Sequence, residues 1–360
     1  MSNNIKPLAI YLPQFHPTPE NDAWWGKGFT EWTNVTKTSP QFKKHKQPNL
    51  PSSTGFYDLR LEEARLMQEA MAKEFGIYGF CIYHYWFNGK RLLNEPVDRK
   101  LKNPKEDLPF LLCWANETWS RRWLGEETEI LIKQEYSELD DQMHMNWLVN
   151  VFKDSRYIKV DNKPVFIIYR PTHIPRIKET LKMFREIAKE NGIDDLYLVG
   201  SNSHSELKDL FELGFDDVLN FQPKLGFLPL SFNEKFNFKR AINNLKFGSF
   251  NPFHKIYAYD KAKALMDKRP LHKYFPCALV GWDNTPRRGN KGIMVVNKTP
   301  EVFKEYLLKD KEELIKQNRP ESENFIFINA WNEWAEGNFL EPSISEGTAY
   351  LEVVKEVFKK

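Results

Sequence analysis

Two glutamates that are three residues apart, Glu333 and Glu336, follow an apolar run and stand beside two tryptophans. The run, residues 325–330, is rich in β-branched and aromatic side chains, which predicts a strand buried on both faces. Glutamate is seldom fully buried without a partner, and an apolar wall such as an indole ring raises the pKa of a nearby carboxyl group. In such surroundings one carboxyl group can hold a proton as an acid while the other stays ionised as a base.

This pair of carboxyl groups suits the cleavage of a glycosidic bond. The reaction needs one group to protonate the leaving oxygen and a second to act as base or nucleophile. Gly337 permits the tight turn that would bring both groups to one pocket. For either glutamate alone, the simpler interpretation is a helix cap or a solvated surface residue. The whole cluster of glutamates and tryptophans favours chemistry.

Eight short apolar runs alternate with amphipathic segments along the chain. The runs are residues 8–12, 77–83, 110–113, 165–169, 196–199, 217–221, 277–280 and 325–330. Buried strands in this number, nearly all separated by helices, predict a (β/α)8 barrel with long irregular insertions in the loops at its C-terminal face. We expect residues 1–360 to form one domain. An open doubly wound sheet is the alternative, but neither of the glycine-rich phosphate motifs typical of that fold occurs.

Polar and aromatic residues follow the predicted strands at their C-terminal ends, the face where barrel enzymes carry their chemistry. Together with the long loop before residue 57, they supply the predicted substrate-binding residues: Tyr11, Gln14, His16, Trp25, Glu31, Trp32, Tyr83, His84, Tyr85, Trp86, Trp114, Asn116, Glu117, Trp282, Asp283, Trp331, Asn332 and Trp334. For each of them alone, packing in the core is as good an interpretation as contact with a ligand. The loop residues expected to form a flap over the site are Gln14, His16, Trp24, Trp25, Glu31 and Trp32.

The composition narrows the class of partner. Aromatic residues make up 14% of the chain, with 11 tryptophans, and many have polar neighbours, as in sites that bind sugar rings. We therefore expect an oligosaccharide or polysaccharide substrate. The net charge is only +3 and the basic residues are dispersed along the chain, which argues against nucleic acid and against an anionic membrane surface.

Metal and cofactor chemistry find little support in the sequence. The eight histidines are scattered without a metal-binding spacing, so we expect no metal and no cofactor. Cys81, Cys113 and Cys277 lie far apart in apolar runs, which predicts reduced residues in the core. The N-terminus lacks the pattern of a signal peptide, and no apolar run approaches the ~20 residues that cross a bilayer. We therefore expect a cytoplasmic protein with no membrane span.

Four segments together resemble the WbsX-like family, whose members carry a domain similar to glycoside hydrolase family 99. The segments read AIYLPQFHPTPENDAWWGKGFTEWTNV, GFCIYHYWF, LCWANETW and AWNEWAEGNFLEP, and the resemblance covers nearly the whole chain. It implies a barrel similar to the endo-α-mannosidases, with two catalytic glutamates in a segment of the form NEWxEG. Matched residue by residue, Glu333 would deprotonate the sugar 2-hydroxyl to give a 1,2-anhydro intermediate, and Glu336 would act as general acid and then base.

The resemblance leaves the reaction open. Ala335 stands where the hydrolases of family 99 carry a histidine, a departure that bears on substrate and reaction. We favour a retaining glycoside hydrolase that acts on a mannoside-like or other bacterial polysaccharide. The alternatives are a glycosyltransferase of O-antigen or capsular (lipopolysaccharide-type) biosynthesis, as the family is often labelled, and a barrel that only binds glycans. No D-x-D pair or phosphate loop supports the transferase, whereas a cytoplasmic location would suit it.

Overall fold

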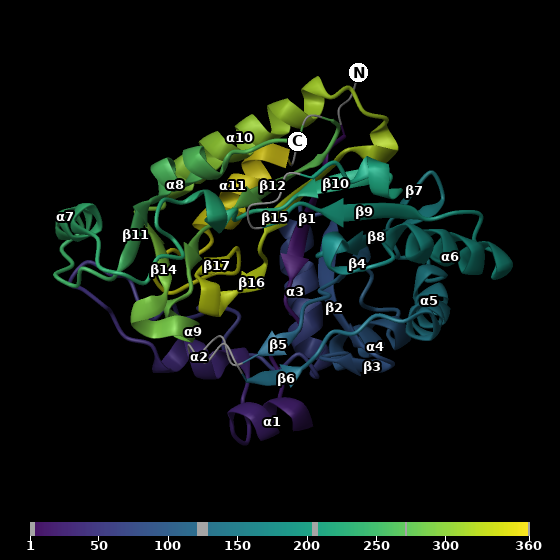
Figure 1. Ribbon diagram of the computed structural model, residues 1–360, viewed down its shortest axis with the longest axis horizontal. Helices are drawn as coiled ribbons and strands as arrows, with labels where there is room; N and C mark the ends of the chain where they lie inside the picture. The colour runs from purple at the N-terminus through teal and green to yellow at the C-terminus, as the bar shows by residue number, and fades with distance from the viewer. Residues whose placement is uncertain (1–3, 121–128, 204–207, 271, 359–360) are drawn as a thin grey trace.

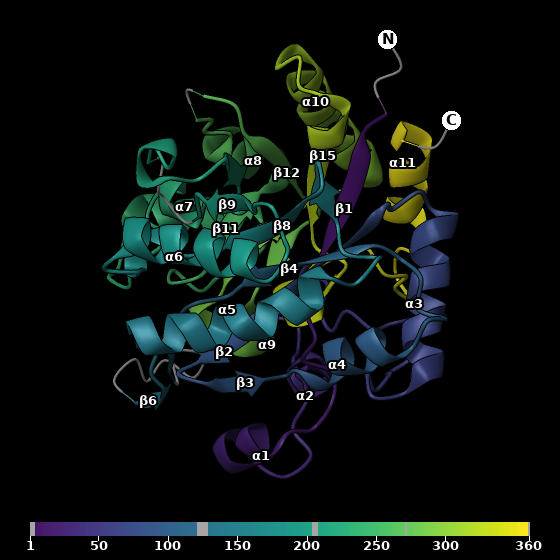
Figure 2. The same ribbon diagram turned by 90° about the vertical axis from the view of Figure 1, so that its right-hand side faces the viewer.

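The computed structural model describes residues 4–120, 129–203, 208–270 and 272–358. Its centre is a closed barrel of eight parallel strands with helices between them, which confirms the predicted (β/α)8 fold (Figure 1, Figure 2). The strands, in order around the barrel, are β1 (Lys6–Tyr11), β2 (Gly79–Phe87), β4 (Phe110–Trp114), β8 (Lys163–Ile168), β9 (Tyr197–Ser201), β10 (Asp217–Asn220), β12 (Phe275–Leu279) and β15 (Phe325–Asn329). Pairing of β15 with β1 closes the ring, so all eight predicted runs are barrel strands.

Helices cover the outside of the barrel, and local sequence signals set where they begin. Ser137 caps α5 (Glu138–Phe152) by accepting a hydrogen bond from the backbone N–H of Asp140. Thr299 caps α10 (Pro300–Lys316). Pro300 suits the first turn of this helix because the N–H that proline lacks would have no partner within the helix there. The other helices that follow barrel strands or loops on the outside are α3 (Glu62–Glu74), α4 (Glu95–Lys102), α6 (Ile177–Glu190), α8 (Tyr259–Met266) and α11 (Ala349–Phe358).

The two long insertions are less irregular than the sequence suggested. The first contains α1 (Pro19–Trp25) and α2 (Glu31–Lys37), and Thr18 caps α1 through the N–H of Asn21. The second contains α7 (Phe238–Lys246) and leads into a small sheet of β11 (Lys255–Ala258), β14 (Ile293–Val296) and β13 (Trp282–Asp283). Short elements complete the chain: β3 (Lys90–Leu92), β5 (Trp119–Ser120), β6 (Ile130–Ile132), β7 (Lys159–Val160), α9 (Thr285–Arg288), β16 (Asn332–Glu333) and β17 (Asn338–Phe339).

Successive residues of each barrel strand face alternately the barrel interior and the helix layer. In β2, His84 and Trp86 point outward to α5, whereas Tyr83 and Tyr85 point inward. Cys81, Cys113 and Cys277 are buried and free, as predicted. Among the described residues, none of the helices combines the length and the apolarity needed to traverse a bilayer.

Candidate active site

The segment after β15 turns sharply at the C-terminal face of the barrel. Asn332 fixes its start, because its side-chain amide donates to the carbonyl of Leu12 (3.0 Å) and accepts from the N–H of Leu12 (2.8 Å). A single 3-10 turn then carries Trp334 to Glu336, and Gly337 ends it with φ of 60°. A side chain at Gly337 would place its Cβ 3.0 Å from Cβ of Asp283, so the turn needs glycine for both space and conformation.

Arg287, on α9, joins the two predicted catalytic glutamates to a third carboxylate. Its Nη1 donates to Oε1 of Glu336 at 2.6 Å, and its Nη2 donates to Oε2 of Glu333 at 3.3 Å. Its Nε donates to Oε1 of Glu31 at 2.9 Å. The side chain of Glu31 is fully buried, and those of Arg287 and Glu333 are each 8% exposed. The first insertion and the turn after β15, which are distant in sequence, thus place three acids around one guanidinium.

Burial and mutual repulsion make the two glutamates reluctant to ionise. Burial, followed by the charge of Glu336, raises the pKa of Glu333 to about 8, although the charge of Arg287 opposes the shift. Burial also raises the pKa of Glu336, again against Arg287. Burial lowers the pKa of Arg287, but the charges of Glu31, Glu336 and Glu333 outweigh that effect and raise it. The guanidinium therefore stays charged, and Glu333, with its pKa of about 8, holds a proton at neutral pH.

The location of that proton differs from the sequence-based expectation. We expected Glu336 to be the protonated acid and Glu333 to be held ionised by hydrogen bonds. Instead, the shorter contact from Arg287 goes to Glu336, at 2.6 Å against 3.3 Å for Glu333. A short charge-assisted hydrogen bond stabilises the carboxylate that accepts it. The geometry of Arg287 therefore favours the proton on Glu333.

A buried network behind the turn holds it in place. Oε2 of Glu341 accepts from the hydroxyl of Tyr57 (2.8 Å) and from the indole N–H of Trp334 (2.7 Å), and Oε1 accepts from Nε2 of Gln68 (2.7 Å). Burial raises the pKa of Glu341 to about 7, against the effect of these three donors. Trp334 also packs on Trp32, whose ring centroid lies 5.7 Å away. Glu341, Trp334 and Trp32 thus position the turn that carries Glu333 and Glu336.

Three of the predicted residues lie close enough to Glu333 or Glu336 to interact with their charge. Tyr83 and Tyr85 point from β2 into the barrel mouth, where the charge of Glu333 contributes to raising the pKa of each hydroxyl, after burial. Glu117 lies 3.6 Å from Arg170, and its charge contributes to the raised pKa of Glu336. These residues come from different strand ends.

Asp283 and Trp282 border a cavity of about 290 Å³ that Gly337 also lines and whose lining does not include Glu333 or Glu336. Oδ2 of Asp283 accepts from Nε2 of Gln47 (2.7 Å) and pairs with Nε2 of His45 (2.7 Å). Burial acts to raise the pKa of Asp283, but these contacts outweigh it and lower the pKa. The ionised Asp283 therefore ties the first long loop to the turn at Gly337.

Other predicted residues do not face the glutamates. Nε2 of His84 lies 2.9 Å from Nε2 of His144 on α5, and the rings of Trp86 and Trp114 each lie 4.6 Å from His144. His84, Trp86 and Trp114 therefore pack between the barrel and α5. Burial lowers the pKa of His84 to about 3, so this histidine is neutral and structural.

A further group of predicted residues supports loops or packs outside the barrel. The hydroxyl of Tyr11 donates to Gln68 on α3 (2.7 Å), and the amide of Asn116 donates to the carbonyl of Arg170 (2.9 Å). Trp331 is fully buried, and its ring lies 5.1 Å from Phe80 on the same outer side. These three residues and Asn332 therefore have structural contacts.

The residues of the predicted flap occupy different environments. The carbonyl of Gln14 accepts from the N–H of Glu31 (3.1 Å), so it helps to place that carboxylate. His16 is buried, and burial lowers its pKa. Trp32 packs behind the turn, whereas Trp25 is half-buried against Phe29, with ring centroids 5.8 Å apart. From this loop, Glu31 reaches the cation that contacts both glutamates.

Arg287 is the functional candidate that the sequence-based prediction missed. It lies five residues after Trp282, in the segment that leaves β12 at the C-terminal face, and this position was the available signal.

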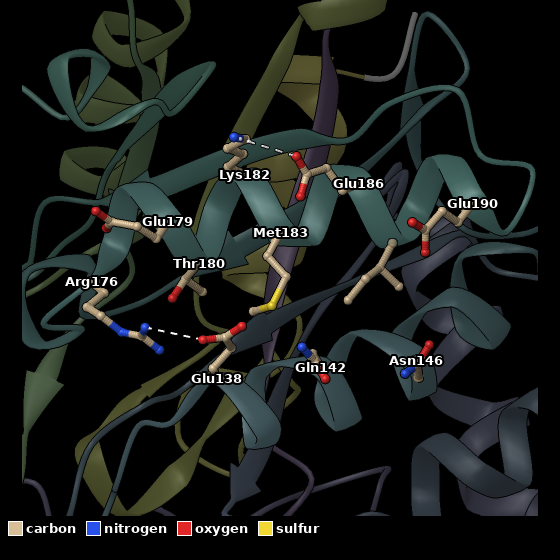
Figure 3. A pocket seen from close by; sticks show the side chains of 11 residues that line it. Glu138, Gln142, Asn146, Arg176, Glu179, Thr180, Lys182, Met183, Glu186 and Glu190 are labelled. Carbon is tan, nitrogen blue, oxygen red and sulfur yellow. Dashed lines mark ion pairs between the residues drawn. The ribbon is translucent and has the colours of Figure 1, made fainter.

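A cavity of about 670 Å³ lies elsewhere, between α5 and α6 on the outer surface (Figure 3). It is lined by exposed helix residues such as Glu138, which lies 3.5 Å from Arg176, and by none of the groups at the strand ends. We therefore assign it no part in the chemistry.

Comparisons with known proteins agree with the resemblance seen in the sequence. The family model described as "Glycosyltransferase WbsX" matches residues 7–354. The chain is 38% identical over 355 residues to the uncharacterised protein WxcX of Xanthomonas campestris pv. campestris strain B100, covering 98% of this chain and 49% of that protein. A second strain, ATCC 33913, has a WxcX protein that is 39% identical over the same shares. The chain thus spans about half the length of the curated relatives it matches.

Solved structures of similar fold include a glycoside hydrolase-like protein, with a TM-score of 0.60 and 13% identity over 99% of this chain and 94% of that one. They also include the GH99 endo-alpha-mannosidase from Bacteroides thetaiotaomicron, with a TM-score of 0.59 and 14% identity over 99% of this chain and 97% of that one. At such identities the likeness concerns the fold. The match of the family model over nearly the whole barrel places this chain in the WbsX family.

Proposed function

We propose that the chain is a carbohydrate-active enzyme that cleaves glycosidic bonds with retention, acting on a mannoside-like or other bacterial polysaccharide. The observation that carries the proposal is the convergence of Glu333, Glu336 and Glu31 on Arg287 at the C-terminal face of the barrel. Two buried carboxyl groups and a third that is 19% exposed surround one cation, an arrangement that costs a fold free energy and that concentrates at active sites. Membership of the WbsX family and the family 99-like fold add support.

The roles implied by the resemblance give a balanced reaction. Glu333, as carboxylate, takes the proton of the sugar 2-hydroxyl, and that oxygen attacks the anomeric carbon to close a 1,2-anhydro ring. Glu336 gives its proton to the departing oxygen as the glycosidic bond breaks. In the second half, Glu336 takes a proton from water, which opens the ring, and Glu333 returns its proton to the 2-oxygen. Two displacements at one carbon give net retention.

Arg287 supplies a means to place the proton for this reaction. Glu336 must carry the proton when the bond breaks, yet in the free site its carboxylate is stabilised by the short contact from Arg287. A sugar hydroxyl that draws the guanidinium away from Glu336 would raise the proton affinity of Glu336 and prepare it as the acid. Arg287 would then act both in binding the sugar and in setting the charge of the pair.

Substitution of each glutamate tests the proposal on a bacterial polysaccharide or a mannoside that the parent protein cleaves. We expect Glu336→Gln to lower the rate by ~10²–10⁴, with a smaller loss for an aryl glycoside whose leaving group needs no proton. Glu333→Gln should abolish turnover of both substrates, because no base remains for the 2-hydroxyl. Glu301→Gln, on the exposed surface of α10, is the matched control and should keep full activity. Full activity of both active-site variants would rule the proposal out.

A glycosyltransferase remains the second candidate, because the family model carries that description and Ala335 departs from the hydrolases. The predicted cytoplasmic location would suit an enzyme that builds precursors of O-antigen or capsular polysaccharide. Calorimetry with nucleotide-sugars separates the two candidates, since the hydrolase is expected to bind none. Tight binding of a nucleotide-sugar, with transfer to an acceptor glycan seen by mass spectrometry, would replace the hydrolase by the transferase. A protein that binds glycans but changes none of them would be a binding module.

A further inference from the structure

The helix α7, in the second insertion, has its polar side buried and its apolar side exposed. Nη2 of Arg240 donates to the carbonyls of Leu230 and Asn233, both at 2.8 Å. Phe238, Ile242 and Leu245 occupy the opposite side, at spacings of four and three residues, and are 70%, 45% and 56% exposed. An isolated surface helix in water normally turns such an apolar stripe toward the core. The contacts of Arg240 hold this helix with its apolar stripe toward the solvent.

Further exposed phenylalanines flank α7, and we call them together with the stripe the α7 patch. Its members are Phe232, Phe236, Phe238, Ile242, Leu245, Phe250 and Phe253. They account for seven of the 17 large apolar side chains that are exposed in the described residues, although residues 232–253 are a short part of the chain. Side chains from the two ends of this segment meet, since the rings of Phe236 and Phe253 lie 6.5 Å apart. Such a concentration marks a surface that contacts something apolar.

The charges around the α7 patch identify the kind of surface that it fits. Lys235, Lys239 and Lys246 lie on the same segment and are exposed. The one acidic residue between 232 and 253 is Glu234, which is ion-paired with the buried Lys255. The segment therefore offers apolar rings with a surplus of positive charge. Phenylalanine and leucine on one side with lysine around them is the pattern of helices that lie in the interface of an anionic membrane.

The position of α7 agrees with such a role. Figure 1 shows the helix at the left edge of the molecule, beyond β11 and outside the barrel. A protruding segment can enter a lipid interface without moving the rest of the fold. Pairing with a second copy through the same surface would instead bring the three lysines of each copy together, which costs free energy.

We propose that the α7 patch docks the protein on an anionic membrane surface, with its rings among the lipid head groups and its lysines on the lipid phosphates. This surface is separate from the glutamates, so the inference stands independently of the proposed reaction. Dispersal of basic residues along the sequence had argued against an anionic membrane partner. The fold changes that argument, because it presents three lysines beside seven exposed apolar side chains.

Co-sedimentation with vesicles tests the proposal, using phosphatidylglycerol mixed with phosphatidylcholine, or phosphatidylcholine alone. The parent protein should bind the anionic vesicles and bind the neutral ones at least tenfold more weakly. The variant Phe238→Ser/Ile242→Ser/Leu245→Ser should lose binding to both. The matched control is Leu139→Ser/Ile344→Ser, which removes side chains that are 68% and 70% exposed elsewhere, and should bind like the parent. Since all of these side chains are exposed, circular dichroism should report an unchanged fold.

A second variant keeps the test decisive if the serine variant fails to fold. Replacing Lys235, Lys239 and Lys246 by glutamine should weaken anionic binding by roughly 100-fold, at roughly fivefold for each lysine near the surface. Glutamine at Lys178, Lys182 and Lys189, exposed on α6, is the control and should change binding little. Equal binding of the parent and the glutamine variant, or no vesicle binding by the parent, would overturn the proposal. So would a dimer of the parent, seen by light scattering, that the serine variant loses.

Discussion

Removing the guanidinium of Arg287 tests the electrostatic account of the site most directly. We consider Arg287→Met, which keeps much of the side-chain volume but leaves Glu31, Glu333 and Glu336 without their shared cation. Breaking a buried ion pair by removing one partner costs about 3–5 kcal/mol, because the remaining charge is left uncompensated. Here the carboxyl groups can avoid part of that cost by taking up protons. The loss of stability should therefore depend on pH.

The sign of that dependence follows from the raised pKa of Glu333, which is about 8 in the parent. A carboxyl group whose pKa is raised by folding binds a proton more tightly in the folded state than in the unfolded state. Its contribution to stability is therefore present at pH values below the unfolded pKa and decreases as the pH rises toward 8, by up to ~1.4 kcal/mol per pH unit. Without Arg287, the pKa values of Glu333 and Glu336 rise further, because the opposing positive charge is gone.

We therefore expect Arg287→Met to melt close to the parent at pH 5 and clearly below it at pH 8. At about 2 °C per kcal/mol for a large domain, the full loss corresponds to roughly 6–10 °C at pH 8. The measurement is thermal unfolding followed by circular dichroism across this pH range. Arg288→Met is the matched control, since it removes the neighbouring arginine of the same short helix, and its melting curve should follow the parent. Equal melting temperatures of Arg287→Met and parent at pH 8, or a difference independent of pH, would refute the reasoning.

Three further predictions concern other parts of the molecule. Gly337→Ala should destabilise the fold by about 1–2 kcal/mol in urea titrations, because alanine resists the left-handed conformation there; an unchanged midpoint would contradict this. The pKa of His84 is lowered to about 3 by burial, so the stability that this group provides is present above pH 6.5 and is lost as the pH falls. The variant His84→Gln/His144→Gln should lose less stability than the parent between pH 6.5 and 4.5, and equal slopes would count against the neutral pair. Finally, activity should survive treatment with EDTA, whereas a loss that added metal restores would reveal a metal site.

The outline of the fold was predictable because it depends on local patterns. The run at residues 325–330 and its seven counterparts are apolar enough to need burial on both faces, and the helices between them leave few alternatives to a barrel. The turn at Gly337 was also predictable, since glycine is the residue that adopts the left-handed conformation freely. These features require no knowledge of which distant segments meet.

The errors arose where a side chain's direction depended on the length of a strand. We expected the second strand to end at Tyr83, with the following residues free to turn toward a ligand. In the structure β2 continues to Phe87, so the alternation of the strand still applies. Tyr83 and Tyr85 consequently face the barrel mouth, whereas His84 and Trp86 face α5. Because the strand ends four residues later than expected, two of the four residues from Tyr83 to Trp86 point to α5 and not toward a ligand.

The groups that set the charge of the site lie outside the barrel strands. Glu31 begins α2 in the first insertion and Arg287 lies on α9, and they are 256 residues apart in sequence. Nothing local in either segment predicts their contact, because it depends on how two loops fold over the barrel. The glutamates at 333 and 336 supply groups that hydrolysis and transfer would both use. What decides between these reactions is therefore to be sought in the loops around Arg287, more than in the motif that carries the glutamates.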